Sequence, residues 1–245
     1  MKFIHTSDLH LGVRPDAGPE YTKRRPEEIW ETFKSILDRC EDEQIDLLLF
    51  SGDVFHRQPV LRELKALNAM FAGLSHTKVV FTAGNHDYLK PNSMYRNFKW
   101  AGNVVPLLEG RLLKVEFPEF RTAVSGFSYL DRELQGGIRV EWKCVRSMEN
   151  EILLLHGGDE KHLSFTRAEV ELLGYDYTAL GHIHKPDPEI TGKCRYSGSP
   201  EPTDPNDTGK HGYVIGTAEN GVVETEFVPA AKREYIHLDI PVDED

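Results

Sequence analysis

The chain has 245 residues, of which 39% are hydrophobic and 28% charged, and its net charge is −11. This composition fits one soluble globular protein and argues against a surface that coats nucleic acid throughout, although it leaves room for a local basic groove. No apolar run approaches the ~20 residues of a membrane helix, and His5, Asp8 and His10 interrupt any signal-peptide core. We expect a cytoplasmic protein with no membrane contact, and its three scattered cysteines fit a reducing compartment.

The first part of the chain alternates between strand patterns and helix patterns. Apolar runs predict buried strands at residues 2–6, 45–50 and 79–82. Between them, one amphipathic helix is predicted from Pro26 to about residue 43, and a second over residues 60–74. The inner face of the second helix is predicted to carry Leu61, Leu64, Leu67, Met70, Phe71 and Leu74. This element order predicts a parallel sheet with right-handed crossovers.

The remainder of the chain is richer in strand patterns. Strands are predicted at 122–127, 152–155, 177–180, 213–217, 222–227 and 235–240, with a short helix near 166–173. We expect one catalytic domain over residues 1–228, followed by a C-terminal strand and acidic tail over residues 229–245.

Polar motifs follow five of the predicted strands. They are Asp8-Leu9-His10, Gly52-Asp53, Gly84-Asn85-His86-Asp87, His156-Gly157 and Gly181-His182-Ile183-His184. Ligands bind beyond the carboxyl ends of strands in open α/β sheets, so these motifs are expected to meet there. The side chains brought together would be Asp8, His10, Asp53, Asn85, His156, His182 and His184. This nitrogen and oxygen set is large enough for two divalent transition metals.

The spacing within the motifs supports a metal centre. Side chains two apart on an extended segment face the same way, so Asp8 with His10, and His182 with His184, can each aim at one site. Each motif alone is more often a turn or a structural histidine, but all five in order after apolar strands favour the site. Because histidine must be neutral to bind a metal, activity is expected to fall in acid.

With these motifs in this order, the sequence resembles the calcineurin-like metallophosphoesterase superfamily, whose signature is D-x-H, GD, GNH[DE], H and GHxH. Its finer details resemble the SbcD-type nucleases of double-strand-break repair. Those details are Ile4-His5-Thr6-Ser7-Asp8-Leu9-His10-Leu11-Gly12, Gly52-Asp53-Val54-Phe55-His56 and Tyr196-Ser197-Gly198-Ser199-Pro200-Glu201-Pro202. The resemblance implies a four-layer α/β fold, in which α-helices flank two central mixed β-sheets.

The resemblance also implies roles for individual residues. Asp53 would bridge two metals, one held also by Asp8, His10 and His184, the other by Asn85, His156 and His182. His86 would sit over the phosphate, stabilise the transition state and help protonate the leaving oxygen, with Asp87 orienting it. His56 matches a nuclease-subgroup histidine that supports phosphodiester cleavage, and the alternative is a polar residue that closes the loop before the second helix.

The function implied is metal-dependent hydrolysis of DNA, as an exonuclease and also a single-strand endonuclease, in DNA repair. We expect Mn²⁺, with Zn²⁺ or iron as alternatives. SbcD-type nucleases usually continue into a DNA-capping domain and a segment that docks an SbcC-type ATPase, so this chain is either a segment of a longer protein or a minimal member. Residues 60–74 could supply a homodimer face. The alternatives are a phosphomonoesterase or small-molecule phosphodiesterase, and a non-catalytic scaffold with the same fold.

One loop is a candidate DNA surface. Residues 88–100 carry Lys90, Arg96 and Lys99 among aromatic residues and no acid, a mixture that suits single-stranded DNA. The aromatics are Tyr88, Tyr95, Phe98 and Trp100, and the basic residues Arg14, Lys23, Arg24 and Arg25 of the first long loop could add to this surface. Alternatively, Phe98 and Trp100 pack beneath the loop and the charges only solvate it. The remaining histidines, His5, His76, His162, His211 and His237, are expected to be structural or surface residues.

Overall fold

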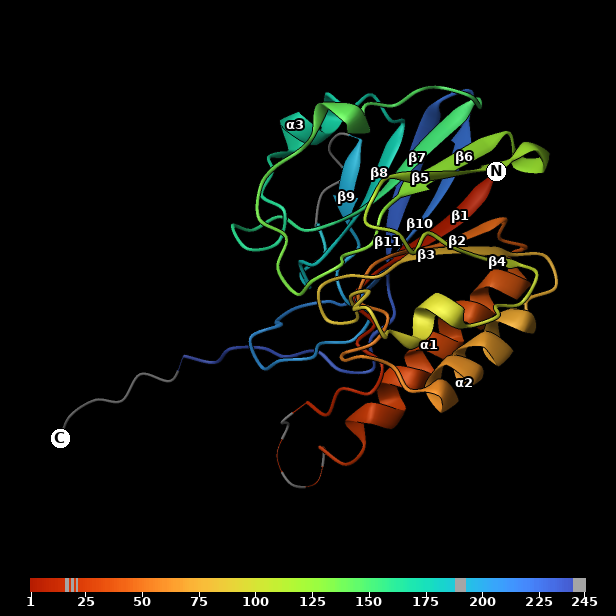
Figure 1. The fold of residues 1–245 in the computed structure, drawn as a ribbon. Helices are drawn as coiled ribbons and strands as arrows, with labels where there is room; N and C mark the ends of the chain where they lie inside the picture. Colours follow the sequence, from red (N-terminus) through yellow and green to blue (C-terminus); the bar gives the residue numbers. More distant parts are fainter. Residues whose placement is uncertain (16–17, 19, 21, 188–192, 240–245) are drawn as a thin grey trace.

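A computed structural model describes residues 1–15, 18, 20, 22–187 and 193–239 (Figure 1). Its α-helices are α1 (Arg25–Asp42), α2 (Leu61–Ala72) and α3 (Arg167–Glu171). The strands are β1 (Lys2–Thr6), β2 (Leu47–Ser51), β3 (Lys78–Thr82), β4 (Val104–Pro106), β5 (Leu113–Phe117), β6 (Thr122–Gly126), β7 (Asn150–His156), β8 (Tyr177–Gly181), β9 (Cys194–Tyr196), β10 (Gly212–Glu219) and β11 (Val222–Pro229). Short 3₁₀ helices cover Met94–Asn97, Pro118–Phe120 and Val140–Trp142.

The strands form two mixed sheets. The first has the order β11-β10-β1-β2-β3-β4, and the second has the order β5-β6-β7-β8-β9. In the first sheet β1 to β4 run parallel, while β10 and β11 are antiparallel to their neighbours. In the second sheet β6 to β9 run parallel and β5 is antiparallel to β6.

The two sheets pack face to face. Because successive side chains of a strand point to opposite faces, one central strand contributes to two separate cores. In β2, Leu47 and Leu49 join an apolar core with Ile152 and Leu154 of β7, between the sheets. Leu48 and Phe50 point the other way, into a core covered by α1 and α2. Helix α3 covers the outer face of the second sheet (Figure 1). The layers are therefore helices, sheet, sheet and a thin outer layer, as the predicted fold class requires.

Most predicted elements are present, and the exceptions have local causes. Leu61 is 47% exposed, so its predicted place on the inner face of α2 is wrong. The predicted strand at 235–240 is also wrong over its described residues. Tyr235 makes a single bridge with Thr208, and residues 236–239 pair with no strand in the part of the chain that the structure describes. Ile240 and the acidic end of the tail lie outside the described residues. The short strands β4, β5 and β9 were not predicted.

The division into domains at residue 228 stays a prediction. Among the described residues, none of the helices combines the length and the apolar character needed to span a membrane.

Candidate metal centre

The predicted ligands follow the carboxyl ends of strands in both sheets. β1 leads to Asp8 and His10, β2 to Asp53, β3 to Asn85, and β8 to His182 and His184, while His156 is the last residue of β7. The backbone at Asp8, His10, Asp53 and His182 has φ values of 52°, 47°, 50° and 96°. Such left-handed conformations are uncommon outside glycine and concentrate at functional sites.

Two glycines allow the ligand segments to approach one another. A Cβ atom on Gly84 would lie 2.3 Å from Oδ1 of Asp53 and 2.7 Å from Nε2 of His156. A Cβ atom on Gly52 would lie 2.3 Å from Nδ1 of His156. Both positions therefore exclude any larger residue while the site keeps this geometry.

The first group of ligand atoms comes from Asp8, His10 and His184. Nε2 of His10 lies 3.0 Å from Nε2 of His184 and 3.9 Å from Oδ1 of Asp8. Oδ1 of Asp8 is buried and accepts no hydrogen bond from the described residues. A buried carboxylate oxygen without a partner is costly, and a cation among these three side chains would satisfy it.

The second group comes from Asn85, His156 and His182. Oδ1 of Asn85 lies 2.8 Å from Nε2 of His156 and 3.1 Å from Nδ1 of His182. His156 uses its other ring nitrogen, Nδ1, to donate to the backbone carbonyl of Ser51 at 2.8 Å. In the neutral ring, this bond would place the lone pair on Nε2, the nitrogen that faces the group.

Asp53 lies between the two groups. Its Oδ2 is 3.9 Å from Nε2 of His10 on one side and 3.5 Å from Nε2 of His156 on the other. Burial raises the pKa of Asp53, but the nearby His156, His10 and His86 outweigh it and hold that pKa below its usual range. Burial also lowers the pKa of His10 well below normal. An ionised aspartate and a neutral histidine are the forms that bind metals.

These residues fit divalent cations. Among the described residues, Asp8, His10 and His184 form one potential metal-binding group, and Asp8, Asp53 and His156 form another. The structure brings all seven predicted ligands to one end of the two sheets. Which ion each of them would hold remains a proposal.

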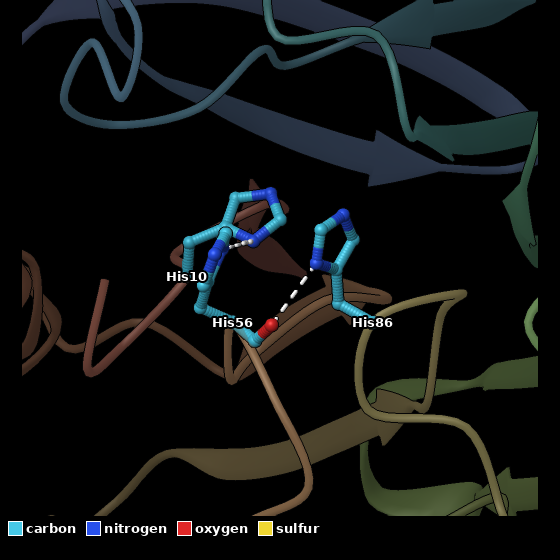
Figure 2. A group of neighbouring side chains, drawn as sticks. All are labelled: His10, His56 and His86. Atoms are coloured by element: carbon cyan, nitrogen blue, oxygen red, sulfur yellow. Dashed lines mark hydrogen bonds between the residues drawn. The ribbon is translucent and has the colours of Figure 1, made fainter. Parts of the chain in front are cut away.

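His56 and His86 lie beside these groups (Figure 2). The imidazole of His86 donates from Nδ1 to the backbone carbonyl of His56 at 3.0 Å, and its Nε2 points away from that carbonyl. The backbone N–H of His86 donates to Oδ1 of Asp53 at 2.8 Å. Nδ1 of His56 lies 3.4 Å from Nδ1 of His10. The loop after β2 therefore sets the orientation of the His86 ring.

Asp87 does not orient His86, which corrects the prediction. The Asp87 carboxylate is fully buried and accepts hydrogen bonds from Gly84 N at 2.9 Å, Phe55 N at 3.1 Å and the Tyr95 hydroxyl at 2.8 Å. Burial is the main cause of a raised pKa at Asp87, and the charge of Asp53 adds to it. These hydrogen bonds link three loops beneath the site, and none of them involves the His86 ring.

The candidate DNA loop has a folded interior. Tyr95 is buried, and Trp100 packs against Phe81 with a ring-centroid distance of 4.9 Å and against Phe98 at 4.8 Å. The guanidinium of Arg96 donates to the carbonyls of Leu89 and Lys90 at 2.8 and 3.2 Å. Tyr95 is thus unavailable for base stacking, and Arg96 stabilises the loop itself. Lys99 is exposed and Lys90 is partly exposed.

Arg25 is not part of a basic surface, although the sequence suggested it. Its side chain is fully buried and donates to Glu28, Glu201 and the Pro202 carbonyl at 2.8, 2.9 and 2.7 Å. Arg14, Lys23 and Arg24 are exposed. Asp16, which would dilute their charge, lies outside the described residues.

His5, expected to be a structural or surface residue, is buried between Tyr177 and Ser51, with contacts of 2.9 and 3.0 Å to their hydroxyls, and burial lowers its pKa to about 3. Sequence reasoning missed two carboxylates beside the ligands. Asp159 and Asp207 contact His182 and His184. Asp159 follows Gly157 and Gly158 directly after His156, and that glycine pair was the one local signal of a sharp turn at the site.

A family model for calcineurin-like phosphoesterases matches residues 1–186, a span that contains all seven predicted ligands. The chain belongs to the calcineurin-like phosphoesterase family. Membership identifies it as a hydrolase of phosphoesters in a family that uses divalent metals, and confirms the resemblance drawn from the motifs.

Curated relatives within this family are distant. An uncharacterized metallophosphoesterase, YhaO of Bacillus subtilis, is 27% identical over 93% of this chain and 60% of its own length. The DNA double-strand break repair protein Mre11 of Methanocaldococcus jannaschii is 26% identical over 98% of this chain and 69% of its own length. The SbcD component of the SbcCD nuclease of Escherichia coli is 24% identical over 92% of this chain and 67% of its own length. The chain thus spans about 60 to 69% of these relatives.

Proposed function

We propose that this calcineurin-like phosphoesterase hydrolyses phosphodiester bonds of DNA at a dinuclear metal centre, as an exonuclease and single-strand endonuclease in DNA repair. The observation that carries the proposal is the position of Asp53, whose Oδ2 lies between His10 and His156. When bound, two divalent ions would activate a water and stabilise charge on the phosphate oxygens.

The proposal divides the ligands between two ions. Asp8, His10 and His184 would hold one, and Asn85, His156 and His182 the other, with Asp53 shared. The buried, unsatisfied Oδ1 of Asp8 supports the first group. Four nitrogen and oxygen donors per ion suit Mn²⁺, and Zn²⁺ or iron would accept the same set.

His86 would act on the substrate and not on the metals. Because its Nδ1 proton is donated to the His56 carbonyl, Nε2 is the atom available to a phosphate oxygen. A protonated Nε2 can stabilise charge on the phosphate and transfer a proton to the leaving oxygen. His56 would support cleavage in two ways, through its carbonyl, which orients His86, and through its own ring beside His10.

DNA as the substrate is supported by relatives named as a DNA double-strand break repair protein and as part of a nuclease. Lys90 and Lys99 would contact the DNA backbone, with Arg96 holding their loop in shape. A partner ATPase of the SbcC type, a homodimer through α2 and a cytoplasmic location are part of this proposal.

The proposal is tested with one set of substrates. The chain, loaded with Mn²⁺, is assayed on labelled single-stranded DNA, on bis(p-nitrophenyl) phosphate and on p-nitrophenyl phosphate. We expect cleavage of the DNA and of the diester, with the monoester turned over far more slowly. Turnover of the monoester alone would establish the phosphomonoesterase alternative. Cleavage of the small diester without DNA would establish a small-molecule phosphodiesterase, and absence of both metal and turnover would establish a scaffold.

A further inference from the structure

Each histidine of the His182-Ile183-His184 motif has both ring nitrogens engaged. Nδ1 of His182 lies 3.1 Å from Oδ1 of Asn85, and its Nε2 lies 2.8 Å from Oδ2 of Asp159. Nε2 of His184 lies 3.0 Å from Nε2 of His10, while its Nδ1 lies 3.1 Å from Oδ2 of Asp207. In each ring, one nitrogen faces the ligand groups and the other faces a carboxylate from a separate loop.

An ionised carboxylate carries no proton, so it can accept hydrogen bonds but cannot donate them. The proton of neutral His182 must then sit on Nε2, and that of neutral His184 on Nδ1. We propose that Asp159 and Asp207 are positioning residues that fix these opposite tautomers, so that His182 presents Nδ1 and His184 presents Nε2 to the metal centre. This inference rests on the proposed function, because it takes both histidines as ligands.

Asp159 is held in place although it lies at the surface. Its side chain is 46% exposed, a setting in which an aspartate ordinarily samples several rotamers. Oδ1 accepts hydrogen bonds from the backbone N–H of Lys161 and of His162 at 2.8 and 2.9 Å, and from Nδ1 of His162 at 2.9 Å. The His162 ring also packs on that of His182, with centroids 4.5 Å apart. The Oδ2 atom is thereby directed at His182.

Gly157 and Gly158 build the turn that carries Asp159. Their φ values are 148° and 131°, which side chains rarely adopt. A Cβ atom on Gly158 would lie 2.2 Å from the Tyr196 hydroxyl, which itself donates to the Gly157 carbonyl at 2.9 Å. The chain can thus turn from His156, a ligand of the second group, to Asp159, a support of His182, within three residues.

Asp207 is fixed by a different loop. Its Oδ2 accepts from the backbone N–H groups of Thr203 and Asp204 at 2.9 and 3.1 Å and from the Thr203 hydroxyl at 3.1 Å. The side chain of Asp207 is 17% exposed. Each support therefore accepts hydrogen bonds from the backbone of its own loop, and the two differ in exposure, Asp159 being the more exposed.

Loss of such a hydrogen bond to a metal-binding histidine costs about 10- to 100-fold in metal affinity. The primary test is Asp159→Ala, with Glu160→Ala as a matched control, because Glu160 is its exposed neighbour and carries the same charge. Two quantities are measured: affinity for Mn²⁺ by calorimetry, and the tautomer of His182 in the metal-free protein by ¹⁵N NMR. Thermal unfolding of the metal-free variant shows whether the fold is kept.

We expect Asp159→Ala to weaken Mn²⁺ binding about tenfold or more and to shift part of His182 to the Nδ1–H tautomer. Thermal unfolding of metal-free Asp159→Ala should match that of the parental chain. The Glu160→Ala control should keep the parental Mn²⁺ affinity and the parental His182 tautomer. A parental tautomer in Asp159→Ala would overturn the role of Asp159, whatever the affinity. Failure of the parental chain to bind Mn²⁺ would instead overturn the proposed function, while the tautomer still decides whether Asp159 fixes His182.

Asp207→Ala tests the second support, with Asp204→Ala as the control from the same loop. The change removes Oδ2, which contacts both Nδ1 of His184 and the backbone N–H groups of Thr203 and Asp204, so thermal unfolding of the metal-free variant shows whether the fold is kept. We expect the Nε2–H tautomer of His184 to appear and one Mn²⁺ to bind more weakly. An unchanged His184 tautomer would overturn the role of Asp207.

Discussion

Tyr95 donates its hydroxyl proton to Oδ2 of Asp87 at 2.8 Å, and both side chains are buried. This contact joins the candidate DNA loop to the turn that carries Asn85 and His86. The aromatic residue that suggested base stacking in the sequence is therefore a structural support of the site.

Replacing Tyr95 with Phe tests this support. The buried carboxylate of Asp87 would keep the hydrogen bonds from Gly84 N and Phe55 N but lose the one from the Tyr95 hydroxyl. We expect the free energy of unfolding to fall by about 1.5–3 kcal/mol, measured by urea denaturation. Tyr88→Phe should leave it unchanged, since the Tyr88 hydroxyl makes no hydrogen bond among the described residues. Equal stability of the two variants would show that the Tyr95 bond contributes nothing.

Replacing His86 with Asn should separate catalysis from metal binding. We expect both metals to stay bound and turnover of bis(p-nitrophenyl) phosphate to fall about a hundredfold or more, the scale for an acid–base or charge-stabilising group. Metal content is measured by mass spectrometry on the same samples. His237→Asn, at an exposed histidine, is the control. Loss of a metal from the His86 variant would make His86 a ligand and reverse its proposed role.

Neutralising Lys90 and Lys99 tests the DNA surface without disturbing the loop that Arg96 holds. Each lost phosphate contact should flatten the slope of log affinity against log salt by about 0.7 for single-stranded DNA. We expect weaker binding and a shallower slope, with the small diester cleaved at the parental rate. The control changes Lys34 and Lys65, exposed residues on α1 and α2. If both pairs of changes alter the slope equally, the loop is not a DNA groove.

Acid should weaken the link between α1 and the segment after β11. Hydrogen bonds from Arg233, and secondarily from Arg25, lower the pKa of Glu28 from 4.5 to about 2. A lowered folded pKa means that this stability is complete above pH 4.5 and is lost as the pH falls toward about 2. We expect Glu28→Gln to reduce unfolding free energy by about 1–2 kcal/mol at pH 6, after allowing for solvent screening, and by little near pH 2.

Urea denaturation at the two pH values measures this difference. Glu27→Gln is the control, because Glu27 lies in the same helical turn and makes no ion pair among the described residues. A Glu28 variant that loses as much stability at low pH as at pH 6 would contradict the assignment.

The sequence allowed the strands and the ligands to be predicted for one physical reason. Buried strands such as β2 and β7 are continuous apolar runs, and polar motifs at the carboxyl ends of five such strands together indicate one site. β9 has only three residues and β5 alternates at a sheet edge, so neither has an apolar run. Residues 235–239 have a strand pattern, but among the described residues they make only the single bridge between Tyr235 and Thr208.

The partners of the ligands could not be predicted in this way. Asp87 follows His86 in the chain, yet its bonds come from Gly84, Phe55 and Tyr95. Asp207 reaches His184 from a loop 23 residues away. Such contacts depend on how loops pack against one another, and no local spacing encodes them.

The shared position of Asp53 is tested most directly by counting metals. Mass spectrometry on the Mn²⁺-loaded parental chain, on Asp53→Asn and on Asp38→Asn, an exposed control on α1, gives the number of ions per chain. We expect about two ions in the parental chain and the control, and loss of both metal occupancy and turnover in Asp53→Asn, because a shared carboxylate serves both sites. Two ions retained by Asp53→Asn would contradict the dinuclear account.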